Sequence, residues 1–153
     1  MVGVSNDKPD HIPTISAVMT PFPWVISMED SLATAKALMK GHAIRHLPVT
    51  TNKGRAIGVV SHRDIYVAES VCFDEAEQES LTVADAAVRN AYIVNTHERL
   101  DRVLIEMASR HIGSAIVVKD DKVAGIFTVT DACRHFGEFL RRMFPDQGDD
   151  VVA

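Results

Sequence analysis

Two short stretches of the chain place a hydroxyl group and a carboxylate three residues apart. Residues 58–64 and 125–131 share one form: glycine, two apolar residues, serine or threonine, two further residues and aspartate. A carboxylate that follows a strand can accept hydrogen bonds from both hydroxyls of a ribose. The hydroxyl and the first amides of a following helix can bind a phosphate. The resulting ribose candidates are Asp64 and Asp131, and the phosphate candidates are Ser61 and Thr128.

The same residue types also have a purely structural interpretation. A serine or threonine that precedes a helix accepts a hydrogen bond from the backbone three residues later, and an acidic residue there can return one. Two hypotheses therefore stay open for Asp64 and Asp131, namely ribose binding or helix capping alone. His62, which follows Ser61 directly, is a further candidate for contact with a phosphate.

The two motifs belong to an internal repeat. The two aspartates are 67 residues apart, and the stretches 32–39 and 100–107 correspond at an offset of 68. The change of offset means that the second copy is one residue shorter. This deletion falls in a turn between strands, where loop length varies freely. The chain therefore predicts two copies of one unit. Their boundaries are 13–69 and 81–144, with an exposed acidic connector at 70–80 and tails at 1–12 and 145–153.

Each copy predicts the order β-α-β-β-α. Short β-prone runs at 24–26 and 92–94 precede apolar residues spaced by three and four, which predict helices starting at Leu32 and Leu100, the first ending at Gly41. Strand pairs follow at 46–49 with 56–60 and at 114–118 with 123–127. Closing helices begin around Arg63 and Asp131, and Thr14 and Thr82 can cap short helical turns. Because units of about 60 residues bury too little surface alone, we expect a shared core in an α/β (α+β) fold.

The composition excludes several classes of protein. The 153 residues are 46% hydrophobic and 24% charged, which predicts a folded chain. A formal net charge of −5 makes a nucleic-acid partner a minor alternative. No apolar stretch approaches the roughly 18 to 20 residues of a membrane span, so we expect no membrane partner and a cytoplasmic protein. Cys72 and Cys133 are far apart and predict neither a disulfide framework nor a zinc site.

The sequence lacks the common catalytic and metal-binding signatures. It contains no Gly-x-Ser-x-Gly elbow, no Walker loop and no Gly-x-Gly-x-x-Gly. His42 and His46 are separated by a predicted helix end, so they do not form a helical metal pair. We therefore expect no catalytic residues, no metal site, no required cofactor and no enzyme activity.

Taken in order, these motifs resemble the cystathionine beta-synthase (CBS) domain family over roughly residues 13 to 142. The resemblance rests on the two repeated motifs and on Val18-Met19-Thr20-Pro21 and Ile44-Arg45-His46-Leu47-Pro48-Val49. It implies a tandem pair, or Bateman module, whose β-α-β-β-α units pack sheet to sheet about a pseudo-twofold axis. Two equivalent clefts would bind an adenosine ligand such as AMP, ATP or S-adenosylmethionine, and the helical faces would form a homodimer.

The resemblance also implies roles for single residues. Arg45 occupies the position of a cation that reaches ligand phosphates, and the alternative is an ordinary surface arginine. Arg63 resembles the position from which one repeat helps to hold the phosphate in the other repeat's cleft. Arginine suits both positions because its planar fork can bind two phosphate oxygens. Adenine recognition implies apolar and main-chain contacts, with core packing as the alternative for the aliphatic candidates. These adenine candidates are Thr20, Val59, Ile112 and Ile126.

The second copy departs from the first at these positions. Gly113 and Thr130 stand where the first copy has Arg45 and Arg63, and 86–89 lacks the proline of 18–21. We therefore expect the cations to come from the first repeat alone and the two clefts to bind unequally. The sequence predicts a regulatory ligand-binding module that acts on an effector protein in trans. The alternative is an interaction or assembly module whose clefts bind no nucleotide.

Overall fold

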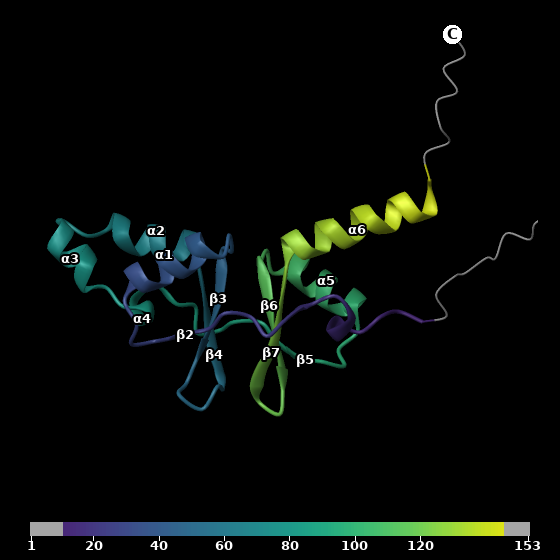
Figure 1. The fold of residues 1–153 in the computed structure, drawn as a ribbon, viewed down its shortest axis with the longest axis horizontal. Coiled ribbons are helices and arrows are strands. Elements are labelled where there is room, and N and C mark those ends of the chain that lie inside the picture. Colours follow the sequence, from purple (N-terminus) through teal and green to yellow (C-terminus); the bar gives the residue numbers. More distant parts are fainter. Residues whose placement is uncertain (1–10, 146–153) are drawn as a thin grey trace, which may run out of the picture.

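The chain folds into two similar halves that lie side by side (Figure 1). The structure is a computed structural model and describes residues 11–145, so 1–10 and 146–153 of the predicted tails lie outside it. One half has a three-stranded sheet in the order β2-β3-β4, and the other has a four-stranded sheet in the order β1-β7-β6-β5. Strand β3 contacts β7 and β4 contacts β6, so the two sheets meet at the centre of the molecule. The predicted α/β fold of paired repeats is confirmed.

Both halves follow the predicted order β-α-β-β-α. In each, the first strand pairs parallel with the second, which pairs antiparallel with the third. The first half contains β2 (Ile26–Ser27), α1 (Leu32–Gly41), β3 (His46–Thr50), β4 (Ala56–Ser61) and α2 (His62–Ser70). The second contains β5 (Ile93–Asn95), α5 (Leu100–Ser109), β6 (Ser114–Lys119), β7 (Lys122–Thr128) and α6 (Val129–Met143). Shorter elements are η1 (Ile15–Ala17), β1 (Thr20–Pro21), α3 (Glu75–Ser80) and α4 (Val83–Ala86).

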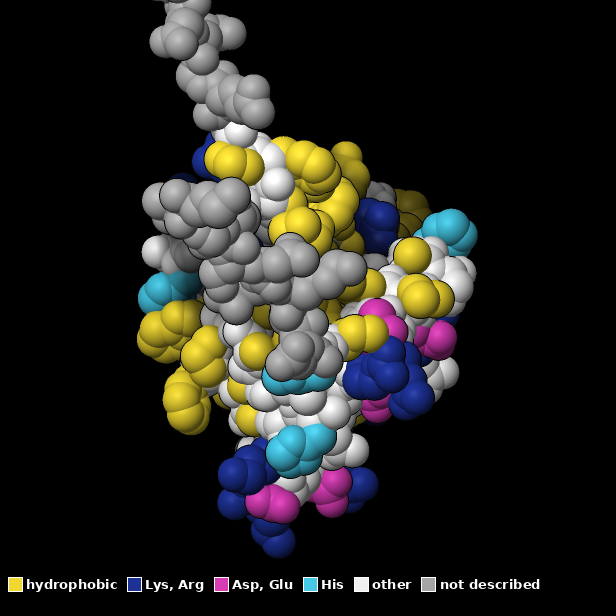
Figure 2. All heavy atoms as spheres, turned by 90° about the vertical axis from the view of Figure 1, so that its right-hand side faces the viewer, with side chains coloured by type: hydrophobic (Ala, Val, Ile, Leu, Met, Phe, Trp, Pro, Cys, Tyr) yellow, Lys and Arg dark blue, Asp and Glu magenta, His cyan; other side chains and the backbone are white. Residues whose placement is uncertain are grey.

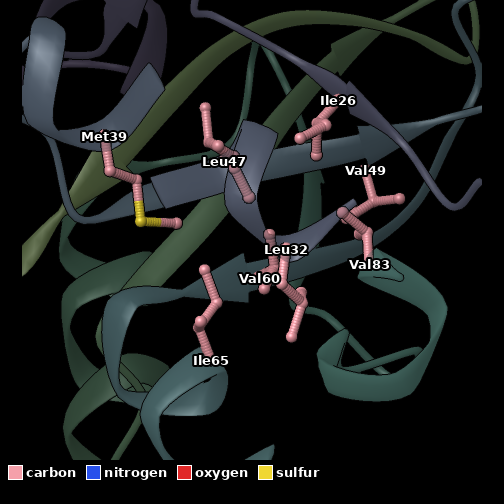
Figure 3. Close-up of a cluster of buried hydrophobic side chains, with 9 residues drawn as sticks. Ile26, Leu32, Met39, Leu47, Val49, Val60, Ile65 and Val83 are labelled. Atoms are coloured by element: carbon pink, nitrogen blue, oxygen red, sulfur yellow. The ribbon is translucent and has the colours of Figure 1, made fainter. Parts of the chain in front are cut away.

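The expectation of one shared core was wrong, because each half has its own hydrophobic core, built from the predicted apolar stripes and completed by a segment of the other repeat. In the first half, Leu32 and Met39 of α1 point toward Leu47 of β3 and Val60 of β4 (Figure 3). The core of the second half includes Val103 and Met107 of α5 together with Phe127 of β7, and all three are buried. Burial of these side chains fixes which face of each sheet its helices cover.

The segments that lead into the two repeats are exchanged between the halves. Ile15 of η1 is buried in the core of the second half, and Val83 of α4 is buried in the core of the first. Strand β1 pairs antiparallel with β7, and Val88 forms an isolated bridge with Val59 of β4. Each compact half therefore contains a segment from the other sequence repeat, which makes the two repeats structurally interdependent.

The first glycine of each repeated motif leaves room for this exchange. A Cβ atom at Gly58 would lie 2.9 Å from the carbonyl oxygen of Val88. At Gly125 it would overlap the sulfur of Met19 and lie 3.1 Å from the carbonyl oxygen of Thr20. A larger residue at either position would push the exchanged segment away from the sheet.

Several local expectations need correction. Trp24 lies outside β2, which begins at Ile26, because the parallel pairing with β3 starts only there. Helix α1 ends at Gly41 as predicted, but the left-handed residue that follows the helix is Ala43, with φ of 52°. The Thr14 side chain makes no capping bond and pairs with Ser16 instead, whereas Thr82 bonds Asp85 in a capping box.

The acidic connector is exposed as predicted, but it also contains a helix that was not predicted. Helix α3 begins after Asp74, whose carboxylate accepts a hydrogen bond from the amide of Glu77 at 2.9 Å. None of its residues is buried, so no apolar stripe marks it in the sequence. Among residues 11–145, no helix is long and apolar enough to cross a membrane.

Candidate functional site

Two cavities lie where the halves meet, and they share part of their walls. We call them the Asp131 pocket and the Arg63 pocket, with volumes of about 550 and 650 Å³. Both volumes fall in the range of small-molecule sites. Arg45 and His46 line both pockets. The Asp131 pocket is otherwise lined by Thr20, Pro23, Trp24, Ala43, Ile44, Ile126, Thr128, Thr130, Asp131 and Arg134. The Arg63 pocket is otherwise lined by Ser61, His62, Arg63, Leu104, Met107, Ala108, His111, Ile112, Gly113, Val129 and Ala132.

The carboxylate of Asp131 is held by the start of α6. Its Oδ2 accepts hydrogen bonds from the amide and the hydroxyl of Thr128 at 2.9 and 2.7 Å, and its own amide donates to Thr128 Oγ1 at 3.3 Å. The other oxygen, Oδ1, lies 3.2 Å from Nη1 of Arg134. Asp131 is only 6% exposed, although it lines the pocket.

Capping and ligand binding are therefore compatible at Asp131. The cap uses Oδ2 and fixes the orientation of the carboxylate, while an ionised carboxylate has acceptor capacity on both oxygens. The side chain of Arg134 is 58% exposed, so the partner of Oδ1 can rearrange toward an entering ligand. The arrangement offers a buried, oriented anion that can accept hydrogen bonds from a diol.

Asp64 forms the same cap but lines neither of the two pockets. Its Oδ2 accepts from the amide and hydroxyl of Ser61 at 2.8 and 2.6 Å. Asp64 is absent from the lining of both pockets, although Ser61 lines the Arg63 pocket. The residue of α2 that corresponds to Arg134 is Val67, so the arginine contact of Asp131 has no counterpart at Asp64.

The adenine candidates are distributed unequally. Thr20 of β1 and Ile126 of β7 are register partners and both line the Asp131 pocket. Ile112 lines the Arg63 pocket. Val59 lines neither pocket, because its backbone is bridged to Val88 of the exchanged segment. A ribose candidate, a hydroxyl candidate and adenine candidates therefore meet together only in the Asp131 pocket.

The cations differ from the sequence expectation in two ways. Arg63 and His62 line the Arg63 pocket beside Ser61 of their own repeat, and neither lines the Asp131 pocket. Arg45 reaches both pockets. The expectation that the first repeat supplies every cation was wrong for the Asp131 pocket, because Arg134 of the second repeat lies one helical turn after Asp131.

The Asp131 pocket also has an aromatic wall that was not predicted from the sequence. Trp24 lines the Asp131 pocket and stacks on His42 with ring centroids 4.0 Å apart and an angle of 16° between the planes. Its side chain is about half exposed, at 53%. In the sequence, Trp24 is a large aromatic residue that follows two prolines and lies close to Thr20, which could have indicated this role. Trp24 was instead predicted to lie in a strand.

His46 lines both pockets, and the residues around it change the pKa of its imidazole. Burial is the largest cause that lowers the pKa of its imidazole, Arg63 and Arg45 add to this effect, and Asp64 opposes it. A Cβ atom at Gly113 would lie 3.0 Å from Nε2 of His46, so the glycine in the second repeat makes room for this ring. A neutral imidazole there can act as both donor and acceptor.

No group of three or more His, Cys, Asp or Glu side chains in the described part of the chain could hold a metal ion. The side chains that line the two pockets offer carboxylate, hydroxyl, imidazole and guanidinium groups. This donor set is suited to binding a polar ligand with an anionic part.

Comparison with known proteins agrees with this geometry. The CBS domain profile matches the chain twice, at residues 15–70 and 83–138. L-aspartate semialdehyde sulfurtransferase of Methanocaldococcus jannaschii is 27% identical over 139 residues, which are 89% of this chain and 26% of that protein. Homoserine O-acetyltransferase of Methanocorpusculum labreanum is 34% identical over 119 residues, or 75% of this chain and 22% of that protein. This chain thus spans about a quarter of the length of these curated relatives.

A solved structure extends the comparison to three dimensions. The CBS domain pair of protein MJ0100, in complex with 5′-methylthioadenosine and S-adenosyl-L-methionine, is 26% identical and superposes with a TM-score of 0.73. The match covers 84% of this chain and 99% of that one. Together with the two profile matches, the exchanged segments and the paired sheets, this shows that the chain belongs to the CBS domain family and forms a tandem CBS pair.

Proposed function

We propose that this CBS pair is a regulatory module that binds an adenosyl compound or adenine nucleotide in the Asp131 pocket. The observation that carries the proposal is the position of Asp131, a buried and oriented carboxylate in the wall of a cavity of about 550 Å³. In a structure that only needed a helix cap, this carboxylate would not have to face a cavity. Asp64 forms the same cap and lines neither of the two pockets.

Each wall of the Asp131 pocket suits one part of such a ligand. The carboxylate of Asp131 would accept hydrogen bonds from the ribose hydroxyls. The apolar and main-chain surface of Thr20 and Ile126 would hold the adenine. The phosphates would meet the hydroxyl of Thr128, the start of α6 and the guanidinium groups of Arg45 and Arg134.

The comparison with solved structures supports this ligand class. The CBS pair of MJ0100 carries 5′-methylthioadenosine and S-adenosyl-L-methionine, both of which contain an adenosyl group. The preference among AMP, ATP and S-adenosylmethionine depends on the charge of the side chains that line the pocket. Two arginines line the pocket beside one aspartate, which favours a phosphate.

The Arg63 pocket has the phosphate-binding candidates without the ribose-binding one. Ser61, His62, Arg63 and Arg45 all line it, while Asp64 and Val59 do not. We expect it to bind the same ligand more weakly, or to accept only an anionic group. Of the predicted ribose and adenine contacts, only Ile112 is present there.

The proposed output is binding and not catalysis. A ligand that contacts the two halves differently in two relative poses would shift the equilibrium between them. We propose that the pair forms a homodimer and passes this change to an effector protein in trans.

Isothermal titration calorimetry with AMP, ADP, ATP, S-adenosylmethionine and 5′-methylthioadenosine tests the proposed function. At least one of these ligands should bind with saturable heat, and Arg45→Ala should weaken a phosphate-bearing ligand while leaving adenosine unchanged. The matched control is Arg89→Ala, because Arg89 lies outside both pockets. A folded protein that binds none of the five would favour the assembly module over the ligand sensor.

A further inference from the structure

Both carboxylate oxygens of Asp131 have partners in this structure. Oδ2 accepts the two hydrogen bonds of the cap, and Oδ1 accepts one from Nη1 of Arg134 at 3.2 Å. A ribose that binds Asp131 in the way proposed above therefore competes with the cap or with Arg134. The cap is made by the backbone and the hydroxyl of Thr128 at the start of α6, so Arg134 is the partner that can leave.

The ion pair between Arg134 and Asp131 joins an exposed base to a buried acid. On the face drawn in Figure 2, by contrast, Lys and Arg side chains lie beside Asp and Glu side chains at the surface. Among residues 11–145, the acid of every other ion pair has a side chain that is at least 21% exposed, whereas the side chain of Asp131 is 8% exposed. Because the Arg134 side chain is 58% exposed, its guanidinium can turn away while the carboxylate stays in place.

The 5′ group of the ligand decides whether the broken ion pair is replaced. Asp131 is the one acid among the residues that line its pocket, and Arg45 and Arg134 are the two arginines. When ribose hydroxyls take Oδ1, Arg134 loses its acceptor and keeps its N–H donors. A 5′-phosphate supplies a new acceptor, and the planar guanidinium can bind two of its oxygens. The thioether of 5′-methylthioadenosine is only a weak acceptor, and the sulfonium of S-adenosylmethionine is a cation.

We propose that Arg134 exchanges partners when a ligand binds, from Oδ1 of Asp131 to the 5′-phosphate of an adenine nucleotide. Before the exchange, the ion pair opposes any ligand whose ribose needs Oδ1. After it, a ligand with a 5′-phosphate regains the lost contact, and a ligand without one does not. Arg134 thereby makes the Asp131 pocket selective for adenine nucleotides over uncharged and cationic adenosyl compounds. This inference rests on the proposed function and narrows its ligand class.

Arg45 and the first repeat offer two internal comparisons. Arg45 lines the same pocket but forms no ion pair among residues 11–145, so it has no contact to exchange. Loss of Arg45 removes only an attraction for phosphate, whereas loss of Arg134 also frees Oδ1 for the ribose. In the first repeat, Val67 stands at the position of Arg134, so Asp64 has no such competitor.

Calorimetry with adenosine and AMP tests the exchange, because these two ligands differ only in the 5′-phosphate. The unaltered chain should bind AMP about tenfold or more tightly than adenosine. Arg134→Met should weaken AMP roughly tenfold and strengthen adenosine roughly two- to fivefold, the value of one partly exposed ion pair. Arg45→Ala should weaken AMP without strengthening adenosine. Arg141→Met is the matched control on the same helix, because Arg141 lines neither pocket, and it should change both affinities by less than about twofold.

The direction of the change for adenosine separates the exchange from a structural role. An affinity for adenosine that rises in Arg134→Met while the affinity for AMP falls supports the exchange. If this variant binds adenosine as before or more weakly, Arg134 does not compete with the ribose, and the exchange is refuted. Unchanged binding of AMP by the variant refutes the phosphate contact and with it the exchange. An unaltered chain that binds no adenosyl ligand at all refutes the proposed function itself.

Discussion

The Asp131 pocket and the Arg63 pocket start from the same sequence motif and end as different sites. Both motifs cap a helix with a serine or threonine and an aspartate. In the Asp131 pocket, β1 crosses from the other repeat and brings Thr20 and the loop of Trp24 opposite the carboxylate. On the other side, the corresponding segment is bridged through Val88 to Val59, and neither residue lines the Arg63 pocket.

This difference shows that the motif alone does not make a binding site. The capping box fixes where each carboxylate points, but the exchanged segment decides whether a cavity lies in front of it. The cation that reaches Asp131, Arg134, comes from the helix that the motif starts, and its counterpart in the first repeat is Val67.

Substitution of Asp131 and of Asp64, each in a separate variant, should change the ligand affinity by very unequal amounts. Asp131→Asn should weaken the binding of an adenosyl ligand roughly 100-fold, because the ribose loses hydrogen bonds to a buried charge. Asp64→Asn makes the same change at the cap of α2, where the amide oxygen can still accept from Ser61, and should change the affinity by less than about twofold. Calorimetry on both variants measures the ratio, and equal losses would contradict the assignment of the ligand to one pocket.

The two glycines that make room for the exchanged segments should also differ in what their substitution changes. Gly58→Ala should lower the free energy of unfolding by about 1–3 kcal/mol, because its Cβ would meet the rigid backbone of Val88. Gly125→Ala should cost less stability, since the thioether of Met19 can move, but it should weaken ligand binding by displacing β1. Urea unfolding and titration of both variants test this. Unchanged binding by Gly125→Ala would show that β1 is not part of the site.

The aromatic wall should matter less than the carboxylate. Trp24→Ala should weaken an adenosyl ligand by roughly three- to tenfold, the value of one lost aromatic contact. Phe22→Ala is the matched control, because Phe22 is 91% exposed and lies outside the pocket. As Trp24 is the single tryptophan, its fluorescence should also respond to ligand in the unaltered chain. No response at saturation would place the ligand elsewhere.

The smallest effect concerns His46, which lines both pockets. Its pKa is lowered in the folded state, so the unfolded chain binds a proton first as the pH falls from about 6.5. The stabilisation by neutral His46 is therefore complete above that pH and is lost toward the lower folded-state pKa. His46→Gln should reduce the fall in unfolding free energy between pH 7.5 and 5.5 relative to the unaltered chain. An equal fall in the two proteins would contradict this.

Much of the fold was predictable because its signals are local. Apolar residues three and four apart predicted α1 and α5, and the motif ends predicted the starts of α2 and α6 to within a residue or two. The strand pairs were predicted within two residues. The exchange of β1 and α4 was not predictable in this way, since pairing between Thr20 and Ile126 joins residues that are distant in the sequence.

The site was predicted in part, for the same reason. A motif could nominate Thr128 and Asp131, but nothing local showed that Asp131 lines one of the two pockets and that Asp64 lines neither. Arg134 was missed because its role depends on the helix turn that places it beside the carboxylate. Helix α3 was missed because caps, and not buried apolar residues, mark its start.

A crystal structure of the protein with S-adenosylmethionine or AMP bound tests the central claim most directly. The ribose should lie in the Asp131 pocket with its two hydroxyls within hydrogen-bond distance of the Asp131 carboxylate, and Thr20 and Ile126 should contact the adenine. A ligand whose ribose is held by Asp64, or which occupies neither pocket, would contradict the account.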